Sequence, residues 1–232
     1  MQRRSFTSGL LSGVSLCSVG IAPAAHAAPV LSDADASSGI RAALERGAEA
    51  AVSLLGKPDG FLGNPKVKIA LPGFLKDGAK LLKATGQGKR VDELVTAMNR
   101  AAEAAVPEAK ELLLGAVKSM SVEDGARILS GGDNSVTDFF AQKTREPLGV
   151  KFLPIVTQAT EKVSLAEKYN AVAGKVAGLG LVDKKDANIQ QYVTGKALDG
   201  LYLMIAEEER KIRKDPLGTG SDILKKVFGS LK

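Results

Sequence analysis

The chain has 232 residues, a formal net charge of +6 at pH 7 and only 4% aromatic residues, with no Trp, one Cys and one His. A chain of this length can bury a substantial core without disulfides or metal staples. The positive charge is mild, it forms no concentrated stripe, and few aromatic residues are available for stacking, so nucleic-acid binding is not expected.

Residues 1–27 have the three-part layout of a secretory signal peptide. A basic start precedes a mildly apolar stretch at residues 10–21 and the small residues Ala25-His26-Ala27. The apolar stretch is shorter than the ~20 residues that a membrane-spanning helix needs. Arg3-Arg4-Ser5-Phe6 also resembles a twin-arginine export signal, although Thr7 stands where that motif prefers Leu, so the twin-arginine and general secretory routes both stay open.

These features predict export to the periplasm, with cleavage after about Ala27 and a single mature domain of residues 28–232. Cys17 is a poor site for a lipid anchor because the bulky Leu16 precedes it. The only Cys and the only His leave with the signal peptide, and the formal charge falls from +6 to +4 with Arg3 and Arg4. A mature chain without Cys or His excludes disulfides, zinc sites built on those residues, Ser-His-Asp and Cys-His catalysis, and haem with a Cys or His ligand. We expect no metal and no other cofactor.

Apolar residues at three- and four-residue spacing predict an all-α multi-helix bundle of about eight to ten helices. Capping signals such as Ser32-Asp33-Ala34-Asp35 and Ser164-Leu165-Ala166-Glu167 mark helix starts, and Gly residues mark ends. The expected helices cover residues 32–55, 74–85, 91–106, 107–119, 121–130, 135–162 with breaks at Pro147 and Pro154, 164–178, a segment from Asp183 or Asp186 to 214, and 221–229. Residues 198–206 are apolar all round, which predicts a central position for that helix.

One segment, NPKVKIALPG at residues 64–73, alternates like a β-strand, and no second strand-like segment is available to pair with it. Apolar and basic side chains alternate along it, with Val67, Ile69 and Leu71 on one face and Lys66 and Lys68 on the other. It is therefore predicted to be part of an extended arm near residues 62–73. Three roles stay open: an arm laid over the helices, a strand that pairs with a second copy in a homodimer, or a strand that binds an extended peptide of another protein.

The best polar candidates lie in a short internal echo, RGAEAAV at residues 46–52 and RAAEAAV at residues 100–106. Each copy carries Arg and Glu three residues apart, which places both on one helix face beside small Ala residues. Candidate ligand-binding or partner-binding residues are Arg46, Glu49, Asn99, Arg100 and Glu103, together with Lys66 and Lys68 of the arm. They could line a cleft that binds an anion or an amide, or they could form ordinary surface ion pairs worth a few tenths of a kcal/mol.

Other charged clusters favour structural roles. Glu207, Glu208 and Glu209 fan around a helix, so they cannot converge on one point, and we expect solvated side chains. Asp199 lies in an apolar context and needs a Lys or Arg partner if it is buried. The basic amphipathic tail, residues 222–232, leaves peripheral membrane contact open.

Four strings carry a family resemblance: GFLGNPKVKIALPG, AMNRAAEAAVPEAK, MSVEDGARILSGGDNSVTDFF and ALDGLYLMIAEEERKIRKDPLGTGSDILKKVFG. Together they resemble a family of exported bacterial proteins known as domain of unknown function 4197, over about residues 31–229. The resemblance implies a helical envelope domain without an established activity, and it brings no catalytic or binding residues with it.

We therefore predict a non-enzymatic envelope protein that binds a partner protein or a small apolar or anionic ligand. The alternative is a metal-independent hydrolase or lyase that uses carboxylate, Lys or Tyr chemistry. A third possibility is a structural factor that acts at the membrane surface.

Overall fold

The computed structural model describes residues 32–129, 131–162, 164, 167–169, 172, 188–215, 218 and 221–229. The chain divides into two compact units, Met1–Val30 and Leu31–Lys232, and every described residue belongs to the second. The predicted signal peptide and the helix expected from residue 164 to 178 fall wholly or largely outside the described residues, so both stay predictions.

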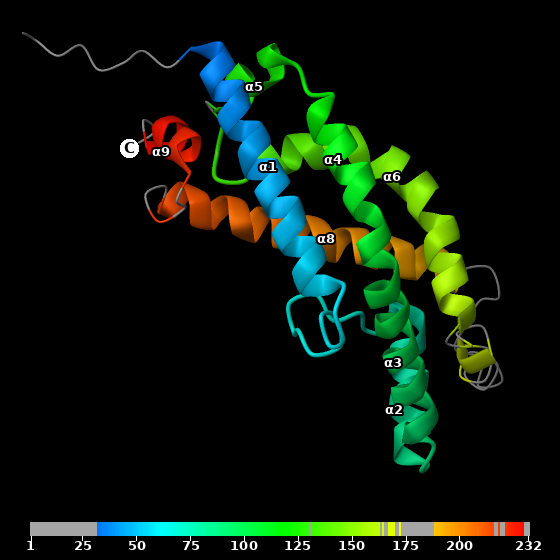
Figure 1. Cartoon of the computed structure of the whole chain (residues 1–232). Coiled ribbons are helices and arrows are strands. Elements are labelled where there is room, and N and C mark those ends of the chain that lie inside the picture. The colour runs from blue at the N-terminus through cyan, green and yellow to red at the C-terminus, as the bar shows by residue number, and fades with distance from the viewer. Residues whose placement is uncertain are drawn as a thin grey trace, which may run out of the picture. The chain divides into compact units, whose positions relative to one another are not determined.

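The described residues form helices and no strand, which confirms the all-α fold class (Figure 1). The helices are α1 (Asp33–Leu55), α2 (Gly73–Ala84), α3 (Gly88–Ala105), the 3₁₀ helix η1 (Val106–Ala109), α4 (Lys110–Lys118), α5 (Val122–Leu129), α6 (Ser135–Lys162), α8 (Ile189–Lys214) and α9 (Asp222–Gly229).

Local capping signals decide where several of these helices begin. The Ser32 hydroxyl accepts a hydrogen bond from the Asp35 backbone N–H at 3.1 Å and donates one to the Asp35 carboxylate at 2.9 Å, so the predicted start of α1 is confirmed. Asn188 caps α8 through the backbone N–H of Gln191, whereas the sequence had suggested Asp183 or Asp186.

Helix α6 continues through Pro147 and Pro154, which were expected to break it. Each proline lacks an N–H and therefore removes one helical hydrogen bond, yet the helix bends instead of ending (Figure 1). Packing supplies the reason: Phe152 and Val156, between and beyond the prolines, are fully buried, and α6 packs on α8 and α3.

Helix α8 lies at the centre of the fold, as its apolar sequence predicted, and packs against α1, α6, α3 and α9. Close contact between α1 and α8 depends on Gly47, where a Cβ atom would lie 3.3 Å from Ile205. The core consists mainly of Ala, Leu, Val and Ile, with Phe61 and Phe152 as its largest fully buried side chains.

The longest described stretch without helix, residues 56–72, connects α1 to α2 and forms the cyan loop in Figure 1. Three alternating side chains of its second half, Val67, Ile69 and Leu71, are buried at 7%, 1% and 8% exposure. Lys66 and Lys68 are exposed. Burial of one face is the arrangement expected of an arm laid over the helices, but the arm is shorter than predicted. The N–H groups of Val67 and Lys68 donate to the Asn64 carbonyl at 3.2 and 2.9 Å, so residues 64–68 form a turn and the arm continues from there to residue 72.

Candidate functional site

The arm is held by a side-chain amide that acts as its missing strand partner. Asn99 of α3, which is fully buried, accepts a hydrogen bond from the Ile69 N–H at 2.8 Å and donates one to the Ile69 carbonyl at 2.9 Å. It also donates to the Val95 carbonyl of its own helix at 2.8 Å. A carboxamide carries both a donor and an acceptor, so one residue pairs both polar groups of the Ile69 backbone, as a neighbouring β-strand would.

Glu103, one turn further along α3, holds the first half of the loop. One of its oxygens, Oε1, accepts the backbone N–H groups of Phe61 and Leu62, both at 3.0 Å. The other oxygen, Oε2, accepts from Arg100 at 2.6 Å, and Arg100 reaches on to Asp59 at 2.8 Å. The hydrogen bond with Glu103 raises the pKa of Arg100 above its ordinary value, against the opposing effect of desolvation.

Helix α8 holds the same segment from another direction. The Tyr192 hydroxyl donates to the Ala70 carbonyl at 2.8 Å, and the Lys66 ammonium pairs with Glu207 at 2.6 Å. Gly200 leaves room for the loop, because a Cβ atom there would lie 2.8 Å from the Phe61 ring and 3.2 Å from Val67.

The structure brings together only part of the predicted site. Asn99, Arg100 and Glu103 all converge on residues 59–70, where their polar groups are used to hold the chain. Glu103 is only 4% exposed, so it is not the ordinary surface pair that one interpretation expected. Lys66 forms its ion pair with Glu207 of α8, and Lys68, two residues further along the chain, is exposed.

The first copy of the echo lies elsewhere and makes different contacts. Glu49 pairs with Lys110 of α4 at 3.3 Å. Arg46 is exposed and lines a hollow of about 450 Å³ together with Glu208 and Lys211. The two copies therefore do not form a common cleft in the described structure.

A second structural cluster was misread from the sequence. Glu209 is only 3% exposed and caps the start of α6, accepting from the Thr137 N–H at 2.9 Å and the Thr137 hydroxyl at 2.5 Å. Arg213 donates to the other oxygen of Glu209 at 2.9 Å and to the Ser135 hydroxyl at 3.0 Å. The expectation of a solvated Glu209 was wrong, because consecutive charges do not reveal which one faces another helix.

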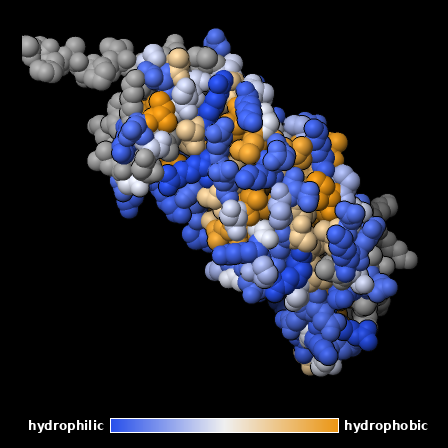
Figure 2. Space-filling view, viewed as in Figure 1, coloured by the Kyte–Doolittle hydropathy of each residue, from blue (hydrophilic) through white to orange (hydrophobic). Residues whose placement is uncertain are grey.

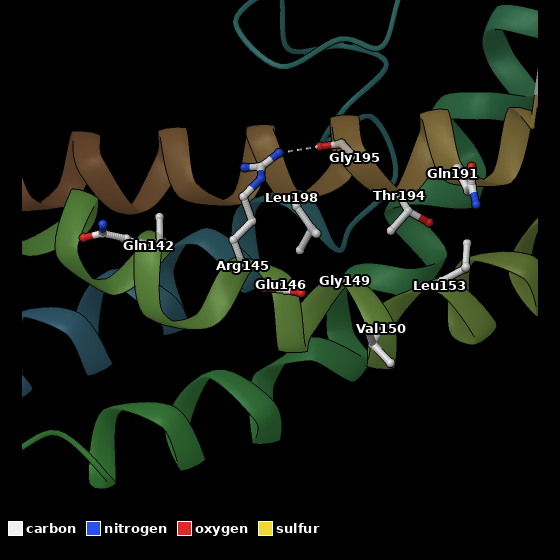
Figure 3. Close-up of a pocket in the computed structure, with 11 residues that line it drawn as sticks. Gln142, Arg145, Glu146, Gly149, Val150, Leu153, Gln191, Thr194, Gly195 and Leu198 are labelled. Carbon is white, nitrogen blue, oxygen red and sulfur yellow. Dashed lines mark hydrogen bonds between the residues drawn. The ribbon is translucent and has the colours of Figure 1, made fainter. Parts of the chain in front are cut away.

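The sequence did not predict an open groove of about 660 Å³ between α6 and α8 (Figure 3). Its lining is mostly apolar and small, with amides and one carboxylate at the edge. The residues are Ala141, Gln142, Arg145, Glu146, Gly149, Val150 and Leu153 of α6, and Gln191, Thr194, Gly195 and Leu198 of α8.

Two glycines make the groove hollow. A Cβ atom at Gly195 would meet no atom within 4 Å, and one at Gly149 would meet only the end of Leu198 at 3.9 Å. Apolar surface is scattered in patches among hydrophilic residues on the face drawn in Figure 2. Among the described large apolar residues that are exposed, Val150 of the groove has the largest exposed fraction, 73%. The sequence signal for this groove was two glycines inside helices without any capping role.

One wall of the groove is fixed by a charged network. Arg145 of α6 forms an ion pair with Asp199 of α8, its guanidinium lies 5.9 Å from the centre of the Tyr202 ring, and Lys196 adds a second ion pair to Asp199 at 3.0 Å. Partial burial acts to raise the pKa of Asp199, but hydrogen bonds from Lys196 and Arg145 outweigh it and hold that pKa below its ordinary value. Asp199 thus has the basic partners that its sequence context called for.

Two hydroxyls near this network are in contrasting states, and of the two residues only Thr194 lines the groove. The Tyr202 hydroxyl lies 2.8 Å from that of Thr144, and burial raises the pKa of Tyr202. Thr194, in contrast, is only 6% exposed, and its hydroxyl has no hydrogen-bond partner among the described residues. Figure 3 shows the Thr194 side chain pointing from α8 toward α6.

In the described part of the chain, no group of three or more His, Cys, Asp or Glu side chains is placed to hold a metal ion. None of the described helices combines the length and the apolar character that crossing a membrane requires.

Comparison with known proteins adds the family and nothing more specific. No curated protein and no solved structure matches the chain. A family model with the description "Protein of unknown function (DUF4197)" matches residues 30–229, which include every described residue. The chain therefore belongs to this family, as the resemblance of its four strings had indicated.

Proposed function

We propose that this protein is a non-enzymatic binding protein of the cell envelope, and that it binds its ligand or partner in the groove between α6 and α8. The observation that carries the proposal is the exposed apolar lining of an open groove, with Val150 at 73% exposure and a hollow at Gly195. A folded protein gains nothing in stability from leaving such surface in water, whereas a bound molecule would cover it.

The polar groups nearby support binding over catalysis. Asp199 is engaged by two cations, and the Tyr202 hydroxyl is buried against Thr144. Likewise, Asn99 and Glu103 are occupied by the backbone of the loop. A hydrolase or lyase would need a carboxylate, Lys or Tyr that is held within reach of a substrate, and these residues are held for the fold instead.

Photo-crosslinking in the native envelope tests the groove directly. The photoreactive amino acid p-benzoylphenylalanine is placed at Val150 or, as the matched control, at Leu81 of α2, another exposed apolar helical residue at 45% exposure. Irradiation should give a discrete adduct from position 150 and none from position 81, as read by mass spectrometry of the purified protein. Equal labelling at both positions, or no adduct at position 150, would contradict the proposal.

The cellular location is part of the same proposal and rests on residues 1–27. Fractionation of cells should place the protein in the periplasm, with a new N-terminus at about Ala28. Replacing Arg3 and Arg4 by Lys keeps the positive charge that general secretion uses but removes the twin arginines. Loss of export in this variant would assign the twin-arginine route, and normal export would assign the general secretory route.

A further inference from the structure

The groove between α6 and α8 has the same components that this protein uses elsewhere to hold an extended chain. We infer that its occupant is an extended polypeptide segment of a partner protein, with apolar side chains at alternate positions. This inference rests on the proposed function, because it names the class of molecule that the groove would take.

The arm, which continues to residue 72 from a turn at residues 64–68, shows how the helices of this fold hold such a segment. A buried carboxamide, Asn99, pairs with both backbone groups of Ile69, while the side chains of Val67, Ile69 and Leu71 enter the core. A glycine in the facing helix, Gly200, leaves the space that the arm occupies. The helices therefore hold the arm with a side-chain amide that both donates and accepts, a hollow at a glycine, and buried apolar side chains at every second position.

The groove presents these components at the surface. Gln142 of α6 and Gln191 of α8 are exposed carboxamides at its edge, and each can donate to one backbone group and accept from another, as Asn99 does. Gly149 and Gly195 form the hollow, and Leu198, only 3% exposed, forms an apolar floor.

Thr194 gives an independent sign that something belongs there. The residue lines the groove, but its hydroxyl oxygen is buried and lacks a partner among the described residues, which is an unfavourable state for a buried polar group. A backbone carbonyl or N–H of a bound segment would supply the missing hydrogen bond after rotation of the Thr194 side chain.

The form of the groove favours a chain over a compact small molecule. Sites for small molecules enclose most of the ligand surface. This groove is open, and its lining extends over about three turns of α6, from Ala141 to Leu153. Extended segments bind to such surfaces through backbone hydrogen bonds and alternate side-chain pockets.

Selection from a displayed library of random ten-residue peptides tests the inference with a defined probe. The target is the whole mature chain, and the matched counter-targets are the Gly195→Leu and Gly115→Leu variants. Both glycines lie inside helices where an added Cβ meets nothing within 4 Å, but only Gly195 lines this groove.

Peptides enriched on the unmodified protein should carry apolar residues at a period of two. They should bind the Gly115→Leu variant equally well and the Gly195→Leu variant at least tenfold more weakly. Thr194→Val, which removes the hydroxyl while keeping the shape, should weaken them about fivefold. Absence of enrichment, apolar spacing of three and four residues, or binding that survives Gly195→Leu would each overturn the inference.

The adduct at Val150 in the envelope separates this inference from the proposed function. A polypeptide adduct whose crosslinked segment carries apolar residues at alternate positions supports both the proposed function and this inference. A lipid or other small-molecule adduct keeps the groove as a binding site but overturns the polypeptide. No adduct at position 150 removes the proposed function itself.

Discussion

Asn99 is the residue whose removal should reveal most about how this fold holds together. Asn99→Ala leaves the Ile69 N–H and carbonyl without partners at a position that is only 1% exposed. A buried backbone group without a hydrogen bond costs about 1–3 kcal/mol, so the two groups together cost about 2–6 kcal/mol. Alanine recovers roughly 0.5 kcal/mol through its better helix propensity.

The expected net loss is therefore about 2–5 kcal/mol of unfolding free energy, out of a typical total of about 5–15 kcal/mol. For a domain of this size, such a loss lowers the melting temperature by roughly 4–20 °C. Asn99→Asp should be at least as destabilising, because its carboxylate still accepts from the Ile69 N–H but faces the Ile69 and Val95 carbonyls without a proton to donate.

Urea unfolding followed by far-UV circular dichroism measures the loss, and hydrogen exchange of residues 66–71 locates it. The matched control is Thr96→Ala on the same helix, where an exposed hydroxyl that donates to the Asp92 carbonyl at 2.8 Å is removed. Its effect should stay within about 0.5 kcal/mol. An Asn99→Ala variant as stable as this control, or one with unchanged exchange at residues 66–71, would refute the role assigned to the amide.

Three further changes follow from the same structure. Gly200→Ala introduces a Cβ atom 2.8 Å from the Phe61 ring and should lower the free energy of unfolding in urea by about 1–3 kcal/mol. Gly115→Ala, whose Cβ would meet nothing within 4 Å, should instead stabilise the protein by about 0.5–1 kcal/mol. Equal effects of the two changes would contradict the close approach of Phe61 to Gly200. Glu209→Gln breaks the buried cap of α6 and should lower the free energy of unfolding by about 3–5 kcal/mol. Glu208→Gln on the same helix removes only an exposed pair with Lys211 and should change it by less than about 1 kcal/mol. A Glu209→Gln variant as stable as the unmodified protein would mean that the cap is not needed. The pKa of Asp199 is lowered in the folded state, so the stability that its carboxylate contributes is present above the ordinary carboxyl pKa of about 3.9 and is lost as the pH falls through the lower folded-state value. The difference in urea midpoint between the unmodified protein and Asp199→Asn should therefore vanish on acidification. A difference that grows with acid would reverse the assigned sign.

Features that depend on neighbouring residues were predicted well. The Ser32 cap, the apolar stripe of α1 and the central position of α8 all followed from spacing of three and four residues along one helix. The alternation of residues 66–71 likewise predicted which side chains of the arm are buried. These patterns are local, because each helix turn or strand repeat is specified by residues only a few positions apart.

Continuation of α6 through Pro147 and Pro154 shows where local reasoning failed. Each proline has a local cost, which favours a break, but burial of Phe152 and Val156 on the neighbouring helices outweighs it. The prediction of a solvated Glu209 was wrong for a related reason. Its partner Thr137 is 72 residues away, and no charge pattern within α8 indicates that contact.

The sequence by itself determined that the protein is helical, that one segment is extended, and that the mature chain it predicts carries no Cys or His for chemistry. Only the tertiary structure decided what the extended segment pairs with: Asn99, 30 residues away, and Tyr192, 122 residues from Ala70. It also decided that Gly149 and Gly195 leave a hollow between α6 and α8. The physical reason is that hydrogen bonds and cavities between helices depend on which faces meet, and spacing along a single helix fixes its own face but not the face opposite.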